Sequence, residues 1–219
     1  TAPPYDSSGW PRFLRLETRL GTEPFDERRR SRVGYAVYGL LETPSHGTLS
    51  IDGHHSPHDG RGTLTLRQRG LPLGDGWTAN HEAGVISSLL PAVSRQPSRI
   101  YLPSVLLQGV TGEWSRDDGG WQWQAATGEP GRLEGQPGNV WRNGVGRRHS
   151  LGLQWRPDAG TPGNDTLQDR GWTLAAQVEA ARDVSRQESP QDSDRFDADG
   201  TLLVARLVGA GERLQMQWL

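Results

Sequence analysis

The chain has 219 residues, a formal net charge of −2 and no cysteine, which excludes disulfide frameworks, thiolate metal sites and cysteine nucleophiles. This charge provides no attraction to nucleic acid, so we expect no nucleic-acid partner. Only 33% of the residues are hydrophobic, but nine are tryptophan, and disordered chains carry few large aromatic residues. We therefore expect residues 1–219 to form a single all-β unit, because barrels and sandwiches of this length are often one domain.

Apolar and polar residues alternate along most of the chain, which predicts strands with two different faces. In chain order, the alternating segments are 14–20, 33–37, 49–51, 64–66, 77–85, 106–114, 121–125, 151–155, 172–180 and 214–218. Gly-Asp-Gly at 74–76 and Asp-Asp-Gly-Gly at 117–120 are typical of tight turns, and Pro44 interrupts the second segment. Because no helical segments separate the strands, we expect antiparallel hairpins that form a β-barrel or part of one, with a soluble β-sandwich as the alternative.

Residues 172–182 are the best helix candidate, because they are rich in Ala, Leu, Gln and Glu. The same residues also alternate, with Trp172 and Leu174 on one face and Gln177 on the other. We favour a strand, since the neighbouring segments show the same period of two.

Four segments with many Gly, Pro or polar residues read as linkers or loops: 53–62, 128–147, 157–170 and 185–200. The last is acidic and nearly free of apolar residues, so we expect 185–200 to be a long exposed loop.

Strand length favours the barrel. Segments 32–41, 77–86, 105–114 and 172–181 span ten residues each, whereas soluble strands average about five or six and membrane strands need about nine to eleven. An aromatic girdle would contain the tryptophans near strand ends, which are Trp77, Trp114, Trp121, Trp155, Trp172 and Trp218. We expect a lipid-facing set of Leu174, Val178, Leu214 and Met216, with Gln177 and Gln215 in a watery lumen where a charge costs little. In a sandwich the tryptophans would fill the core.

Two clusters contain metal-ligating residue types, but neither has a convincing arrangement. The first contains His54, His55, His58 and Asp59, in a segment whose Gly and Pro residues predict a solvated turn. The second contains Asp192, Asp194, Asp197 and Asp199, whose spacing departs from the calcium-loop motif. We assign no metal-binding residues and expect no cofactor.

Paired carboxylates could hydrolyse glycosides, and the candidates are Glu82, Glu113, Glu129 and Glu134. Glu113 beside Trp114 is the most suggestive, because sugar sites combine acids with aromatic platforms, but we favour an ordinary polar-face position. The nucleophile elbow, the P-loop and the dinucleotide fingerprint are all missing from the sequence. We expect no enzyme activity and assign no catalytic residues. Arg28–Arg30 with Arg32 lie beside acidic residues, so we interpret them as a solvated turn and not as a phosphate site.

Four segments occur in a familiar order: TLTLRQRGLPL (63–73), YLPSVLLQGV (101–110), QAATGEPGRL (124–133) and SLGLQW (150–155). Their order and hairpin rhythm, over about residues 30–219, resemble the barrel region of outer-membrane usher-like proteins of Gram-negative bacteria. Such proteins form translocation pores for pilus subunits. A complete usher is several times longer, with a chaperone-binding domain before the barrel, a plug within it and further domains after it.

The resemblance implies a location in the outer membrane and a transport or surface-fibre assembly role. It also implies outer-membrane lipid and exported protein subunits as partners, and a chain that is a fragment of a larger barrel. The alternative function, from another class, is a soluble carbohydrate-binding β-sandwich or glycosidase-like domain. Its tryptophans would then form the core and sugar platforms.

Overall fold

The computed structural model describes residues 12–22, 31–58, 60–95, 105–134, 140–157, 171–185, 195–208 and 213–218. Most residues in these ranges belong to β-strands, and the one helical element among them is the short 3₁₀ helix η1 (Ala92–Arg95). A search of the described residues found no helix with the length and apolarity to cross a membrane. The prediction of an all-β protein is confirmed.

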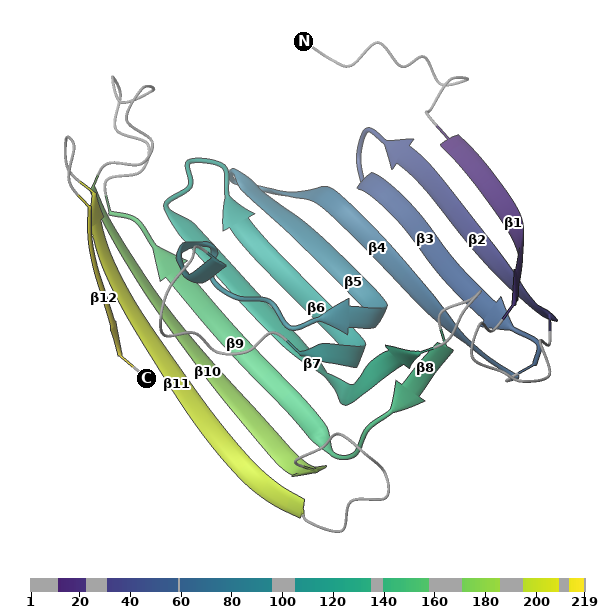
Figure 1. Ribbon diagram of the computed structural model, residues 1–219. Helices are drawn as coiled ribbons and strands as arrows, with labels where there is room; N and C mark the ends of the chain where they lie inside the picture. Colours follow the sequence, from purple (N-terminus) through teal and green to yellow (C-terminus); the bar gives the residue numbers. More distant parts are fainter. Residues whose placement is uncertain are drawn as a thin grey trace.

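The strands pair antiparallel with their sequence neighbours in one sheet. They are β1 (Arg12–Thr22), β2 (Ser31–Thr43), β3 (Gly47–Ser56), β4 (Arg61–Gly74), β5 (Trp77–Ser87), β6 (Leu106–Arg116), β7 (Trp121–Glu134), β8 (Val140–Asn143), β9 (Arg147–Trp155), β10 (Gly171–Ser185), β11 (Arg195–Val208) and β12 (Arg213–Trp218). The order follows the chain, except that β7 pairs with both β8 and β9. Figure 1 shows the sheet curved into an open trough, with β1 and β12 at its two ends.

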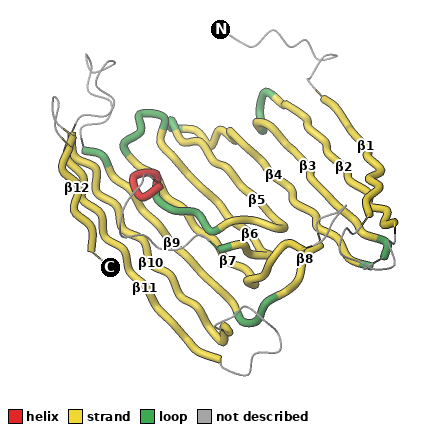
Figure 2. Tube along the Cα trace, viewed as in Figure 1, coloured by secondary structure: helices red, strands yellow, loops and turns green. Residues whose placement is uncertain are grey.

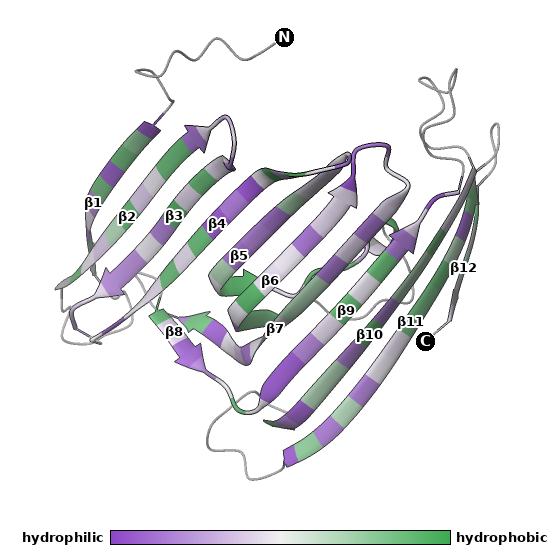
Figure 3. Ribbon diagram, turned by 180° about the vertical axis from the view of Figure 1, so that it is seen from behind, coloured by the Kyte–Doolittle hydropathy of each residue, from purple (hydrophilic) through white to green (hydrophobic). Residues whose placement is uncertain are grey.

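Two elements lie on the concave side of this trough, which we call the inner face. Figure 2 shows η1 in front of the strands, with β8 below it. The convex side, which we call the outer face, is turned toward the viewer in Figure 3. In that view hydrophobic and hydrophilic residues alternate in bands along many strands, as a period of two requires.

The hairpin turns follow the predicted chemistry. Asp75 and Gly76 both have positive φ, +50° and +70°, which is the type I′ geometry that matches the twist of a two-residue hairpin. The turn at 117–120 also forms, with Gly119 at φ +73°. β2 ends at Thr43, directly before Pro44, as predicted.

Residues 172–182 lie inside β10, so the strand is confirmed over the helix. The register explains this outcome, because β10 pairs with β9 along one side and with β11 along the other. An internal strand with two partners satisfies its backbone groups through the ladders, and this outweighs the helix propensity of its alanines.

Three of the predicted loops are partly wrong. Most of 53–62 belongs to β3 and β4, and only a short turn near His58 joins them. The segment 128–147 contains the end of β7, all of β8 and the start of β9. Of 185–200, Ser185 ends β10 and residues 195–200 begin β11, while 186–194 lie outside the described residues. Residues 158–170 also lie outside them.

The two faces of β10 differ in burial. On the outer face, Leu174 and Val178 are 40% and 46% exposed, whereas Gln177 on the inner face is 1% exposed. Leu214 and Met216 are exposed as well, at 54% and 40%. Gln177 does not line an open lumen, because a segment of the chain covers it. Arg at this position would therefore be costly, contrary to the sequence-based expectation.

Candidate functional site

A segment between β5 and β6 folds over the inner face and is held there by glutamine side chains. Gln124 and Gln177 each donate through Nε2 to the carbonyl of Leu89, at 3.1 and 3.4 Å. The amides of Ala92 and Val93 donate to Gln122 Oε1 and Gln154 Oε1, at 3.3 and 2.8 Å. These glutamines come from β7, β9 and β10. Residues 88–95, which we call the inward segment, therefore lie across three strands.

The inward segment also covers a small apolar cluster. Val93 packs with Ala175, Leu202 and Val204 of β10 and β11, and Leu90 lies against them. At the base of the segment, Ser88 and Val105 are joined by two hydrogen bonds, from Ser88 N to Val105 O at 2.9 Å and from Val105 N to Ser88 Oγ at 3.0 Å. The chain therefore leaves the sheet at Ser88 and returns to it at Val105, directly beside Ser88.

The second element on the inner face is the ribbon formed by the end of β7 and β8. It contacts β3 and β4, on the other side of the trough from the glutamines (Figure 1). Trp141 is buried and its ring lies where a Cβ at Gly131 would be, 2.4 Å from the nearest ring atom. Glycine at 131 thus allows the indole to pack directly on the β7 backbone.

A cavity of about 370 Å³ lies between the two inward elements and the sheet. One side carries Asp52, His54, Arg67 and Glu82, and the other carries apolar residues such as Leu89 and Leu133. The volume is in the range of small-ligand sites, about 300–1,000 Å³.

Three glutamates of the structure are each paired with two arginines. Arg15 and Arg19 pair with Glu17 at 2.6 and 2.9 Å on β1. The other two groups join Arg67 and Arg69 of β4 with Glu82 of β5, and Arg132 and Arg142 of the ribbon with Glu134. We call these the three arginine–glutamate clusters. The register places the first two on the inner face, where Glu17 lies opposite Ala36 and Glu82 lies opposite Arg67.

The histidines of residues 54–58 are not gathered on one face. Residues 54 and 55 lie in β3, so their side chains point to opposite faces of the sheet. His54 is nearly buried on the inner face and its ring meets Tyr38 edge-on, with centroids 5.6 Å apart. A search of the described residues found no group of three potential ligands. Asp59 lies outside those residues.

Two aspartates of the acidic cluster at 192–199 form contacts with β10 that the sequence did not indicate. Asp197 accepts a hydrogen bond from the amide of Asp183 at 2.8 Å, and Asp199 pairs with Arg182 at 2.6 Å. Asp192 and Asp194 lie outside the described residues, as do Arg28–Arg30.

Glu82 and Glu113 share the inner face of the neighbouring strands β5 and β6, where they lie two register positions apart, whereas Glu129 and Glu134 belong to β7. Glu113 accepts a hydrogen bond from Gln122 at 2.9 Å. Strand alternation turns it away from Trp114, so the two do not form an acid–platform pair, and Glu113 has the polar-face position that we favoured. Glu82 and Glu134 belong to the arginine–glutamate clusters. Glu129 is exposed in β7.

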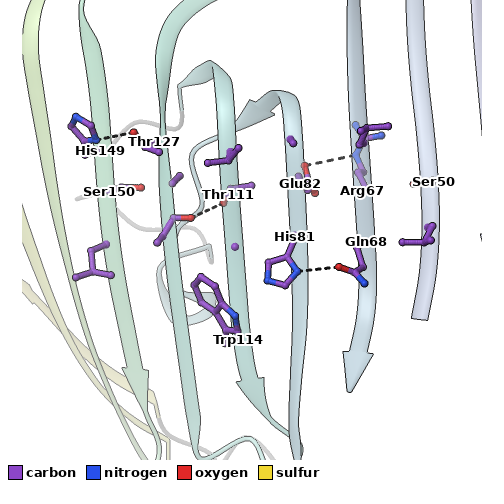
Figure 4. Close-up of a pocket in the computed structure, with 18 residues that line it drawn as sticks. Ser50, Arg67, Gln68, His81, Glu82, Thr111, Trp114, Thr127, His149 and Ser150 are labelled. Carbon is purple, nitrogen blue, oxygen red and sulfur yellow. Dashed lines mark hydrogen bonds and ion pairs between the residues drawn. The ribbon is translucent and has the colours of Figure 1, made fainter. Parts of the chain in front are cut away.

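The outer face carries an open groove of about 850 Å³. Its lining includes Leu49, Leu66 and Leu151 together with the small residues Ala83 and Ala125. Figure 4 shows the polar side chains here turned toward each other, with His81 facing Gln68 and His149 facing Thr127. These two pairs are 3.3 and 2.8 Å apart, so the polar groups in this apolar surface satisfy one another.

Tryptophans form a band across one end of the outer face. When the register is followed from strand to strand, Trp114, Trp123 and Trp218 lie in one cross-strand row. Trp121 pairs with Trp155 in the neighbouring row. The ring of Trp121 stacks on Trp123 and Trp155, with centroid distances of 6.4 and 5.7 Å. Four of the tryptophans predicted near strand ends, Trp114, Trp121, Trp155 and Trp218, thus lie in two neighbouring rows, and Leu153, Ala176 and Leu203 separate Trp123 from Trp218.

Sequence reasoning missed the inward segment and the three arginine–glutamate clusters. A connection of 18 residues between β5 and β6, far longer than the other hairpin turns nearby, was the available signal for the inward segment. Comparison of the chain with protein-family models, with curated proteins and with solved structures found no match.

Proposed function

We propose that this chain is part of the wall of an outer-membrane β-barrel of usher-like type, with a role in transport or surface-fibre assembly. The observation that carries the proposal is the apolar outer face: large apolar side chains such as Leu16, Leu174 and Trp218 are exposed on strands from one end of the sheet to the other. Water-soluble proteins rarely expose contiguous apolar patches larger than several hundred Å². Hydrocarbon in contact with the outer face would remove that cost.

Three further features support the membrane location. The strands β4, β7, β10 and β11 contain 14 or 15 residues each, enough to cross a bilayer when tilted. The tryptophan band has the position of an interfacial girdle. The polar side chains of the outer groove are paired with each other, as groups in contact with lipid must be.

The usher-like role is supported by the order of the four resembling segments and by the hairpin meander that contains them. In this role the inner face would line the path of exported protein subunits, and outer-membrane lipid would surround the tryptophan band. The edges of β1 and β12 would pair with further strands to close the barrel, because lipid leaves no partner for an open strand edge.

Lipid quenching tests the proposal. Single cysteines at 174, 177 and 178, labelled with an environment-sensitive fluorophore, are placed in the folded protein in vesicles that contain brominated lipid. We expect quenching at 174 and 178, which are exposed on the outer face, and little at 177. If the protein stays folded and none of the three positions is quenched, the membrane location is wrong.

One observation favours a second candidate function, a carbohydrate-binding domain. Trp123 and Trp155 are 41% and 37% exposed, and stacked indoles can act as a platform for the apolar face of a sugar ring. Titration with soluble oligosaccharides should then change the tryptophan fluorescence in the absence of lipid. A protein that remains folded in water and responds in this way would favour the second candidate.

A further inference from the structure

The three arginine–glutamate clusters share one arrangement. The glutamates are 14–30% exposed, whereas the six arginines are 34–69% exposed. Each carboxylate therefore lies behind two guanidinium groups and holds them by ion pairs. Each cluster has a net charge of +1, although the whole chain has a net charge of −2.

A guanidinium has five N–H donors in a rigid fork, and one carboxylate cannot engage them all. The remaining donors of Arg67 and Arg69 belong to partly exposed groups on the inner face. The glutamate restricts their motion, so less entropy is lost when they bind a second anion. Rows of arginines are also how channel proteins select anionic substrates.

Two of the three clusters lie on strands other than those to which the inward segment is hydrogen-bonded. That segment covers β7, β9, β10 and β11 through the glutamines and Val93. Two clusters are on β1 and on β4–β5, and the third is on the ribbon that contacts β3 and β4. Arg148 of β9 and Arg206 of β11 are also on the inner face but each has a buried Nε atom, whereas the arginines of the clusters are 34–69% exposed.

We propose that the inner face of β1–β5, together with the β7–β8 ribbon, binds an acidic segment of an exported polypeptide through these three clusters. The inference rests on the proposed function for the origin of this polypeptide. Charge complementarity defines the partner as a chain that carries several Asp or Glu carboxylates, each able to take a bidentate guanidinium. The exposed tryptophans that a sugar polymer would stack on lie on the outer face, and on the inner face of the described strands Trp141 is buried. This distribution favours a polypeptide over an acidic polysaccharide.

Fluorescence anisotropy of a labelled oligoglutamate peptide tests the proposal, with the full chain folded in detergent micelles. The test variant Arg67→Gln/Arg69→Gln should weaken binding by about tenfold or more, since it removes two charge-assisted contacts. The matched control is Arg182→Gln/Arg195→Gln, which removes the same charge from exposed ion pairs of β10 and β11. The control should change the affinity by less than about twofold, because distant surface charges are screened by salt.

The variant Arg67→Lys/Arg69→Lys separates geometry from charge. It keeps both positive charges but loses the planar fork, so binding intermediate between wild type and the Gln variant is expected. Circular dichroism and urea midpoints establish that each variant is folded before its affinity is compared.

Several results would overturn the proposal. Equal losses in the test and control variants would mean unspecific attraction, and equal binding of oligolysine would mean that charge plays no part. Tighter binding of oligogalacturonate than of oligoglutamate would assign the surface to a polysaccharide. Failure here is distinct from failure of the membrane proposal: lipid quenching at 174 and 178 without peptide binding refutes only the acidic partner.

Discussion

The inward segment should open as a unit when its glutamine contacts are removed. In the variant Gln124→Leu/Gln177→Leu, the carbonyl of Leu89 loses both of its side-chain donors, which lie at 3.1 and 3.4 Å. Leucine is close to glutamine in volume, so packing beneath the segment is largely retained. A carbonyl left without partners in a partly buried site costs about 1–3 kcal/mol.

The amide of Val93 reports the opening, because it donates to Gln154, which this variant leaves intact. If residues 88–95 move together, a loss of about 1–3 kcal/mol raises the hydrogen-exchange rate of this amide about 5- to 150-fold. The measurement is exchange at peptide resolution on the folded protein in micelles. Gln68→Leu is the control, since this glutamine contacts His81 on the outer face and does not touch the inward segment.

An unchanged exchange rate at Val93 in the double variant would refute the reasoning. It would mean that the apolar cluster around Val93 holds the segment and that the glutamines contribute little. A faster rate in the Gln68→Leu control would also refute it, because the change would then reflect general loosening of the sheet.

Three further predictions concern the sheet itself. Gly131→Ala should lower the free energy of unfolding by about 1–3 kcal/mol, measured as a shift of the urea midpoint, because its Cβ would overlap the Trp141 ring. Gly76→Ala should cost about 1 kcal/mol in the same assay, since alanine is strained at φ +70°; no shift would mean that the turn relaxes. Arg182→Ala should change the midpoint by the equivalent of less than about 1 kcal/mol, because its ion pair with Asp199 is exposed. A larger loss would show that this pair holds the β10–β11 end together.

The strands could be predicted because their signal is local. Alternation along 172–180 places Leu174 and Val178 on one face whatever the neighbouring strand is, and Asp75–Gly76 defines its turn by backbone conformation alone. The antiparallel order then follows from the short connections, since a tight turn joins strands only as a hairpin.

The loop errors have a common physical cause. Gly and Pro at 128–131 and the histidines of 53–58 suggest turns when each residue is judged by its own propensity. In the structure Gly131 makes room for Trp141, and the backbone of β3 has partners in both β2 and β4. In both segments, contacts with residues distant in sequence determine the structure, and the propensity of each residue alone does not reveal such contacts.

The sequence alone also could not show which face of the sheet is covered by other parts of the chain. Period two shows that Gln177 and Leu174 are on opposite faces, but it does not say which face is covered. The segment that covers Gln177 comes from Leu89, 88 residues earlier in the chain. The expectation of a watery site therefore failed for Gln177, although its facial assignment was correct.

The two faces together constrain what surrounds the sheet. The buried apolar cluster of Val93, Ala175, Leu202 and Val204 lies on the inner face and spans only η1, β10 and β11. On the outer face, by contrast, exposed leucines, valines or tryptophans occur from β1 to β12, including Leu16 and Trp218. A sheet in water would have to leave these side chains hydrated, and the hydrophobic effect opposes that over most of the sheet. An apolar phase against the outer face would resolve the conflict without any change to the fold, because the inner face is already partly covered by the inward segment.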